Sequence, residues 1–400
     1  DLRRSRGLGD VYKRQDEFQS WEILSGKGGQ GSYFNPTFLA PKGETKVNGH
    51  STQIITDKAL DWLKKRNRKK PFLLCAQYKV PHIHRLPPTA HMGGYDEYEF
   101  PVPETFFDDF STRSPFVSKT WMALKGMKGH VLNIAPLESE ITDNSKLSPP
   151  FLQEMSKAQR KAWHQAYDPR NMRYRELEKQ GKLKGDERNL YVYQRFIKDY
   201  VRCVDGLDAQ IGRILRFLDE ENLAENTLLV YSSDQGFFTG EHGWAEKRWM
   251  YEESFKSPLL MRWPGVIEAG SVFGDLVQNI DLAPTFLQAA GLDVPKALHG
   301  LALQPLFSES TPKEWRKEVL YQYFDGGTLQ KPGPYNMPRH EGIRNRRYKL
   351  ISFYEYDTWE FYDLHKDPNE LRNLIGDPSM RAKIEGMKKR LKVLINRFSP

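Results

Sequence analysis

Hydrophobic residues recur at helical spacing in two long segments, and each segment leads into a short apolar run. The spacing predicts one helix around residues 55–63 and a longer one over 196–218. Apolar runs at 72–76, 228–231 and 259–263 predict buried strands. Helices that alternate with wholly apolar strands are typical of a parallel sheet covered on both faces. The pattern therefore predicts an α/β fold with a mostly parallel sheet flanked by helices.

The pattern changes towards the end of the chain. Short strands are predicted at 319–323, 348–351 and 359–362, and Ile384, Met387, Leu391 and Leu394 mark one face of a last helix. We therefore expect a small antiparallel α+β subdomain over residues 309–400, after a main domain over 16–308. Residues 101–185 are rich in Pro, Lys and Ser with weak periodicity, which indicates an insertion or a substrate-facing lid.

The first fifteen residues, DLRRSRGLGDVYKRQ, do not match the rest of the chain. They carry basic residues without the apolar stretch of a signal peptide. They resemble a translated sequencing-adapter sequence, so we expect residues 1–15 to be foreign to the fold and the natural start of the protein to be missing. An ordinary basic N-terminus is the alternative.

Composition excludes several classes of protein. Sixty Lys and Arg against 52 Asp and Glu give a net charge of +8, spread along the chain, and no helix-turn-helix, zinc-finger or RNP-type motif is present. We therefore expect no nucleic-acid partner, while an anionic small molecule or polysaccharide stays open. No apolar run approaches the roughly 18 residues of a membrane span. Two cysteines are too few for a disulfide-rich scaffold or a zinc site of paired cysteines.

Polar side chains follow two of the predicted strands, at the edge where α/β sheets bind ligands. Asp234 and Gln235 follow the run at 228–231 and offer oxygen ligands that suit Ca²⁺, although the same residues could form an Asx-type turn. His82 could act as a general acid. Lys79 and Lys247 could hold an anion, although isolated lysines are usually only solvated.

Four longer stretches carry a resemblance to a known family. They are SSDQGFFTGEHGWAEKRWMYEESFKSPLLMRWPG (232–265), FLLCAQYKVPHIHRLPP (72–88), LVQNIDLAPTFLQAAGL (276–292) and YDLHKDPNELRNL (362–374). Together they resemble the formylglycine-dependent sulfatases of the alkaline phosphatase superfamily, whose fold is an alkaline-phosphatase-like α/β sheet. WEILSGKGGQGSYFNP and RHEGIRNRRYKLI are similar to bacterial glycan sulfatases, including N-acetylglucosamine-6-sulfatase-like members.

The resemblance implies a role for each matching residue. Asp234 would be a ligand of one Ca²⁺ ion, with Gln235 where relatives carry Asn, Gln or His. His82 would help to protonate the leaving oxygen, and Lys247 would bind a sulfate oxygen and stabilise charge in the transition state. Sugar or sulfate contacts are implied for Lys79, His242, Arg339 and His340.

Neither cysteine of this chain fits the nucleophile of the family. Formylglycine is made from the first residue of a C/S-x-P/A-x-R motif, which neither Cys75 nor Cys203 begins. The upstream Asp-Asp pair of the family, which would supply further calcium ligands, is also absent. We therefore expect a C-terminal fragment that binds calcium poorly and hydrolyses nothing by itself.

For the parent protein, the resemblance implies a sulfuric ester hydrolase that removes sulfate from a sulfated glycan, in a secreted or periplasmic setting. Two alternatives stay open. One is a phosphoester or phosphonate hydrolase of the same superfamily, and the other is a non-catalytic relative that binds anionic carbohydrate.

Overall fold

The computed structural model describes residues 18–26, 31–127, 129–143, 149–307, 312–324 and 337–398. They form two compact units: the chain up to Pro101 with Met127–Glu221, and Val102–Gly126 with the chain from Asn222 onward. The predicted insertion at 101–185 is thus divided between the units. Residues 1–15 and the predicted boundary at 308/309 lie outside the described residues, so both stay predictions.

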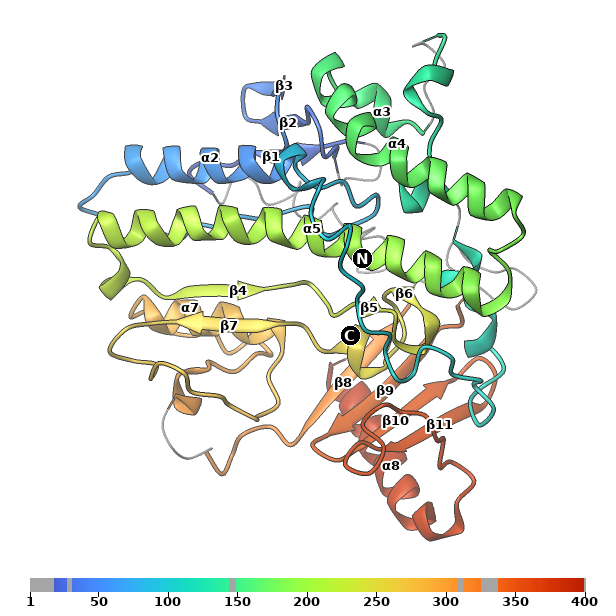
Figure 1. Ribbon diagram of the computed structural model, residues 1–400. Helices are drawn as coiled ribbons and strands as arrows, with labels where there is room; N and C mark the ends of the chain where they lie inside the picture. The colour runs from blue at the N-terminus through green and yellow to red at the C-terminus, as the bar shows by residue number, and fades with distance from the viewer. Residues whose placement is uncertain are drawn as a thin grey trace. The chain divides into compact units, whose positions relative to one another are not determined.

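The first unit is mainly helical. Its helices are α2 (Ser51–Lys65), α3 (Phe151–Glu154), α4 (Lys157–Lys179) and α5 (Gly185–Glu220). The two predicted helices are confirmed as α2 and α5, which pack side by side (Figure 1). Among the described helices, none combines the length and apolar character that a membrane crossing requires.

The strands of the first unit differ from the prediction. Three short antiparallel strands that the pattern does not predict form one sheet: β1 (Ile23–Ser25), β2 (Thr37–Ala40) and β3 (Gly43–Lys46). The strand predicted at 72–76 is wrong, because this segment joins no ladder in the described part of the chain. Its side chains alternate in exposure, with Leu73 60% exposed, so the apolar run is not buried on both faces.

The second unit contains the other two predicted strands. These are β4 (Leu229–Ser232) and β7 (Leu259–Arg262), which pair antiparallel with Val230 opposite Met261. All strand pairs among the described residues are antiparallel, so the parallel pairing expected of the apolar runs is not seen there. Between these strands lie the short strands β5 (Phe238–Thr239) and β6 (Ala245–Glu246) and the helix α6 (Glu252–Phe255), and helix α7 (Leu282–Ala289) follows them.

The predicted antiparallel subdomain is present at the end of the chain. Its sheet has the order β11-β10-β9-β8, with strands β8 (Glu318–Tyr323), β9 (His340–Asn345), β10 (Tyr348–Phe353) and β11 (Thr358–Asp363). Helix α8 (Arg381–Phe398) covers one face (Figure 1). The four predicted apolar residues of α8 are all buried, in one cluster with Ile343, Leu350 and Phe361 of the sheet.

The opposite face of this sheet packs against the middle of the chain. Side chains alternate along a strand, so Lys349, Ile351 and Phe353 share the face of β10 that Leu350 does not. Ile351 and Phe353 belong to an aromatic cluster with Trp244 and Trp249. Lys349 is fully buried, and its ammonium lies 2.9 Å from Glu252 Oε1 and 2.8 Å from Glu370 Oε1.

The two carboxylates around Lys349 have opposite pKa shifts. Burial favours the neutral form of Glu252, but Lys349 and Arg344 outweigh it and lower the pKa to about 2. Burial raises the pKa of Glu370 to about 7, against the attraction of Lys349 and with repulsion from Glu252. Lys349 therefore stabilises two acidic groups that would repel each other without it.

Removing the Lys349 charge should destabilise the second unit strongly. Lys349→Met leaves the buried Glu370 carboxylate next to the partly exposed Glu252 carboxylate, and breaking a buried ion pair from one side costs about 3–5 kcal/mol. We expect a loss of that order in the free energy of unfolding measured with urea at pH 7.5. Lys392→Met, the same change at an exposed position of α8, should alter it by less than about 0.5 kcal/mol. Equal effects of both variants would contradict the role assigned to Lys349.

Candidate functional site

The loop that follows β4 carries the two predicted oxygen ligands. Asp234 is exposed, and Ser233 holds the loop by donating from its hydroxyl to the Gln235 carbonyl at 2.8 Å. The same hydroxyl lies 3.2 Å from Asp234 Oδ1, and the Asn279 amide donates to the Asp234 carbonyl at 3.0 Å. The chain therefore bends here, with the Asp234 side chain exposed and Gln235 partly exposed.

Lys247 lies in a tightly bent segment of the same unit. The residues on either side of it have positive φ angles, 86° for Glu246 and 139° for Arg248, which are strained for side-chain-bearing residues. Lys247 is only 8% exposed, and its Nζ lies 3.4 Å from Glu246 Oε2 and 5.7 Å from the centre of the Phe237 ring. Burial lowers the pKa of this ammonium, against the attraction of Glu246 and Asp234.

Ser254 joins the Asp234 loop to the Lys247 segment. Its carbonyl accepts a hydrogen bond from the Gly236 backbone at 2.9 Å, and its hydroxyl accepts one from the Arg248 backbone at 2.9 Å. The structure thus holds the loop with Asp234 and Gln235 next to the segment with Lys247, and the roles assigned to these residues stay predictions. Ser254 was missed, because a serine inside an apolar and charged stretch gives no sequence signal of such a role.

Lys79 and His82 lie in the first unit, on one turn closed by a hydrogen bond from the His82 backbone to the Lys79 carbonyl at 2.9 Å. Tyr33 contacts both residues. Its hydroxyl donates to the His82 carbonyl at 2.6 Å, and the Lys79 ammonium lies 5.1 Å from the centre of its ring. His82 is partly exposed, with Nδ1 2.9 Å from the Ile83 carbonyl. Tyr33 was also missed, because it is 49 residues away from His82.

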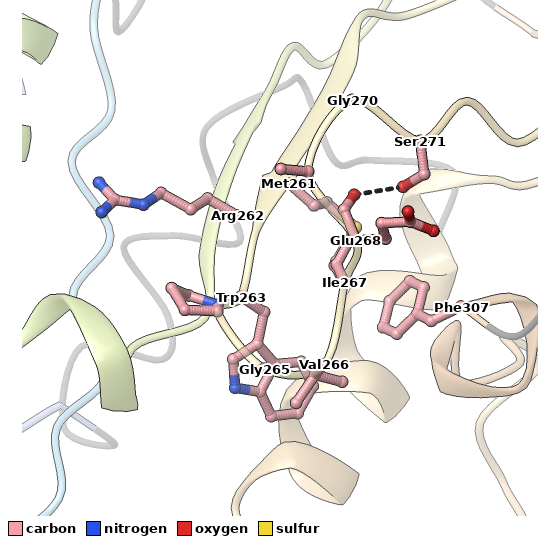
Figure 2. A pocket seen from close by; sticks show the side chains of 12 residues that line it. Met261, Arg262, Trp263, Gly265, Val266, Ile267, Glu268, Gly270, Ser271 and Phe307 are labelled. Atoms are coloured by element: carbon pink, nitrogen blue, oxygen red, sulfur yellow. Dashed lines mark hydrogen bonds between the residues drawn. The ribbon is translucent and has the colours of Figure 1, made fainter.

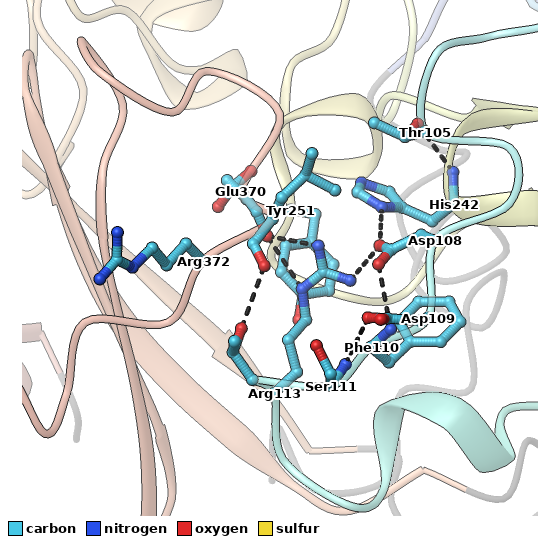
Figure 3. Close-up of polar contacts among 12 residues, drawn as sticks. Thr105, Asp108, Asp109, Phe110, Ser111, Arg113, His242, Tyr251, Glu370 and Arg372 are labelled. Carbon is cyan, nitrogen blue, oxygen red and sulfur yellow. Dashed lines mark hydrogen bonds and ion pairs between the residues drawn. The ribbon is translucent and has the colours of Figure 1, made fainter.

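His242 lies in a buried polar cluster (Figure 3). Its Nδ1 is 2.7 Å from Asp108 Oδ2, and its Nε2 is 3.7 Å from Glu253 Oε1. Burial opposes a charge on the ring, but Asp108 and Glu253 outweigh it and raise the pKa. Arg113 also binds Asp108, and its Nε donates to the Glu370 carbonyl at 2.9 Å. His242 therefore connects structural carboxylates, and its fully buried side chain does not support the predicted contact with sugar or sulfate.

Arg339 and His340 are adjacent in sequence but lie in different surroundings. The Arg339 side chain is exposed and donates to the Phe324 carbonyl at 3.0 Å. His340 is fully buried, and its ring centre lies 5.5 Å from that of Trp249 and 5.4 Å from that of Tyr321. Arg339 thus stays available as a contact, whereas burial of His340 does not support the predicted role in binding sugar.

Two family models match the chain. A model described as "Sulfatase" matches residues 7–292, and one described as "N-sulphoglucosamine sulphohydrolase, C-terminal" matches residues 240–397. The chain belongs to the sulfatase family. The first match begins inside the segment that we predict to be foreign to the fold.

Several known sulfatases and solved structures are similar to this sulfatase chain. An N-acetylglucosamine-6-O-sulfatase of Bacteroides thetaiotaomicron is 37% identical over 364 residues, which are 90% of this chain and 64% of that protein. The chain thus spans less than two thirds of that relative. The structure of BT4656 "in complex with its substrate D-Glucosamine-2-N, 6-O-disulfate" matches with a TM-score of 0.89 and 36% identity, over 95% of this chain and 76% of the other.

A more distant neighbour shows the fold alone. The phosphonate monoester hydrolase of Silicibacter pomeroyi matches with a TM-score of 0.62 and 19% identity, over 99% of this chain and 70% of the other. Together these structures confirm the alkaline-phosphatase-like α/β fold predicted from the sequence.

One pocket of the second unit is lined by none of the predicted site residues. It has a volume of about 660 Å³ and is formed by the loop 261–271 and Phe307 (Figure 2). Apolar side chains such as Trp263 and Ile267 contribute to it, and its loop is closed by the Ser271 hydroxyl, which donates to the Glu268 carbonyl at 2.7 Å. The pocket contains none of the predicted catalytic or metal-binding residues of the sulfatase.

The residues present fit only part of a calcium site. Asp234 and Gln235 supply a carboxylate and an amide oxygen, which suit Ca²⁺, but that ion takes six to eight oxygen ligands. The described residues contain no group of three or more His, Cys, Asp or Glu side chains placed to hold a metal. The pair can therefore contribute to a metal site without forming one.

Gly236 is the position at which the site tolerates no side chain. A Cβ there would lie 2.1 Å from the Glu253 carbonyl oxygen and 2.7 Å from that of Lys256. Gly236→Ala should therefore separate the Asp234 loop from residues 253–256 and lower the free energy of unfolding by about 2 kcal/mol or more. Gly386→Ala, in open space within α8, should instead raise it by about 0.5–1 kcal/mol. Urea unfolding of both variants checks the contrast, and a neutral Gly236→Ala would contradict the packing described.

Burial of His340 predicts a pH dependence of stability. Burial lowers its pKa from an ordinary 6.5 to about 4, although backbone hydrogen bonds at Pro338 and Arg248 partly oppose this. Between these values the unfolded chain binds a proton that the folded chain does not, so stability falls as the pH drops from 6.5 to 4, by up to about 3 kcal/mol.

His340→Phe should make this pH dependence weaker, because the substituted ring cannot be protonated, while buried His50, whose pKa is also lowered to about 4, keeps its own contribution. The measurement is the free energy of unfolding in urea at pH 7.5, 5.5 and 4.5. His365→Phe replaces an exposed imidazole and should leave the change of unfolding free energy with pH as it is in the unsubstituted chain. An unchanged slope in His340→Phe would show that His340 is not the group responsible.

Proposed function

We propose that the protein to which this chain belongs is a sulfuric ester hydrolase that removes sulfate from a sulfated glycan. The observation that supports it most directly is the buried Lys247 ammonium beside the Asp234 loop, in a chain of the sulfatase family. The relative named N-acetylglucosamine-6-O-sulfatase and the substrate complex of BT4656 favour a 6-O-sulfated glucosamine as the substrate class.

Lys247 has the properties needed to hold a sulfate oxygen. Lys247 is 8% exposed, so water screens its ammonium poorly, and burial already lowers its pKa. Its nearest carboxylate oxygen is 3.4 Å away, longer than a tight charge-assisted hydrogen bond. An incoming sulfate ester would give this cation a closer anionic partner and gain further attraction as charge develops on its oxygens.

The leaving oxygen requires a proton, which we assign to His82. Its imidazole is partly exposed, and the carbonyl of Ile83 at 2.9 Å favours a proton on Nδ1. An imidazole is suited to proton transfer near neutral pH. Lys79, on the same turn, would add positive charge for the anionic substrate, and exposed Arg339 is assigned a contact to sugar or sulfate.

A divalent cation, Ca²⁺ in our proposal, would be held in part by Asp234 and Gln235. When bound, such an ion supplies Lewis-acid stabilisation of a sulfate oxygen. Further oxygen ligands are needed beyond this pair. The formylglycine nucleophile of the family is likewise assigned to no residue of this chain. Neither cysteine begins the required motif, and Ser156, which begins a formal match (SKAQR), caps helix α4 by accepting a hydrogen bond from the Gln159 backbone. We further propose a secreted or periplasmic location.

Replacing Lys247 tests the proposal. In the intact protein, Lys247→Ala should lower kcat/KM for sulfate release from glucosamine 6-sulfate by about 10²-fold or more, because a stabilising charge at the reacting group is lost. Lys256→Ala removes an exposed lysine nine positions further along and should leave kcat/KM unchanged. Thermal unfolding midpoints of both variants control for folding. Undiminished turnover in Lys247→Ala would refute the assigned role.

A further inference from the structure

A second pocket in the C-terminal unit is strongly basic. It has a volume of about 490 Å³ and lies between residues 312–318, residues 345–348 and the first turn of α8. Its lining includes two acidic residues, Asp275 and Glu318. Six basic residues line it: Lys313, Arg316, Lys317, Arg346, Arg347 and Lys383.

The arginines of this pocket are already paired with carboxylates. Arg316 binds Asp281, Arg346 binds Asp275, and the Arg347 guanidinium lies 2.8 Å from Asp363 Oδ2. Glu318, the other acidic lining residue, forms an ion pair with Arg390 at 2.7 Å. These pairs neutralise part of the charge and fix the pocket walls.

The three lysines of the pocket are not paired in this way. Lys313, Lys317 and Lys383 are exposed, and within the described ranges no carboxylate lies within ion-pair distance of them. The Lys383 ammonium lies 5.3 Å from the centre of the Tyr348 ring, and the Arg347 guanidinium lies 5.0 Å from the same centre. The ring thus holds two long cationic side chains at the pocket, which lowers the entropy lost when an anion binds.

The positive surface continues along α8. This helix carries seven basic residues and one acidic residue, Glu385, and its apolar face is buried against the sheet. Its basic residues therefore extend the charge beyond the pocket. An open pocket with spread cations is better matched to an extended polyanion than to one small ion, since each exposed lysine contributes little alone.

We propose that this basic pocket and the adjoining face of α8 bind a sulfated polysaccharide, as a second site that holds the polymer. The inference rests on the proposed function in one respect, because the substrate would be part of such a polymer. The pocket shares no residue with the site around Lys247 and Asp234.

The test is the triple variant Lys313→Ala, Lys317→Ala and Lys383→Ala, with heparin as the sulfated polymer. A matched control removes three exposed lysines from the basic run near α2, namely Lys64→Ala, Lys69→Ala and Lys70→Ala. We expect the pocket variant to elute from immobilised heparin at a clearly lower salt concentration, and its Kd for heparin to rise at least about tenfold at low ionic strength. The control variant should elute close to the parent protein.

Activity assays separate this inference from the proposed function. In the pocket variant, kcat/KM for glucosamine 6-sulfate should be unchanged, while KM for a sulfated polymer should rise. Equal heparin retention of the two triple variants would overturn the second site, even if the enzyme desulfates sugars. Equal binding of a DNA oligonucleotide of the same charge would overturn its assignment to sulfated glycan. Absence of sulfate release by the parent protein would refute the proposed function and leave the heparin result interpretable.

Discussion

The buried Lys349 ammonium is the constraint on which the second unit depends. Two carboxylates from distant parts of the chain converge on it, Glu252 at the start of α6 and Glu370 after the last strand. Glu370 in turn accepts a hydrogen bond at its carbonyl from Arg113, which also binds Asp108. Because a buried charge must be paired, these contacts fix the segment containing Lys247 against the C-terminal sheet.

The sequence predicts elements well where one periodicity dominates. α8 buries all four residues that its spacing selects, because a long amphipathic helix has one way to hide its apolar side. α5 forms where its spacing predicts it, but only Phe196, Leu207 and Leu218 of its apolar stripe are buried. The run at 72–76 and the pairing of β4 with β7 show the limit. A short apolar run indicates that a segment can be buried. Which strand it pairs with, and whether the pair is parallel or antiparallel, depends on distant residues.

The same limit applies within the candidate site. Asp234, Gln235 and Lys247 could be predicted together because they belong to one continuous motif. His242 and His340 carry the same imidazole as His82, yet the structure buries both and leaves His82 partly exposed. Burial of a polar side chain is decided by which aromatic and acidic groups surround it, and those groups come from other segments.

The roles of individual lysines also become apparent only from their surroundings in the structure. A dispersed net charge of +8 does not show which lysines bind a ligand, since exposed lysines are solvated at small cost. Lys349 is buried and fully paired, which suits a structural role. Lys247 is buried, and its carboxylate partner Glu246 lies 3.4 Å away. An anion that reaches Lys247 therefore competes only with this weak ion pair. The looser pairing of Lys247 supports its proposed role in binding, in contrast to the structural role of Lys349.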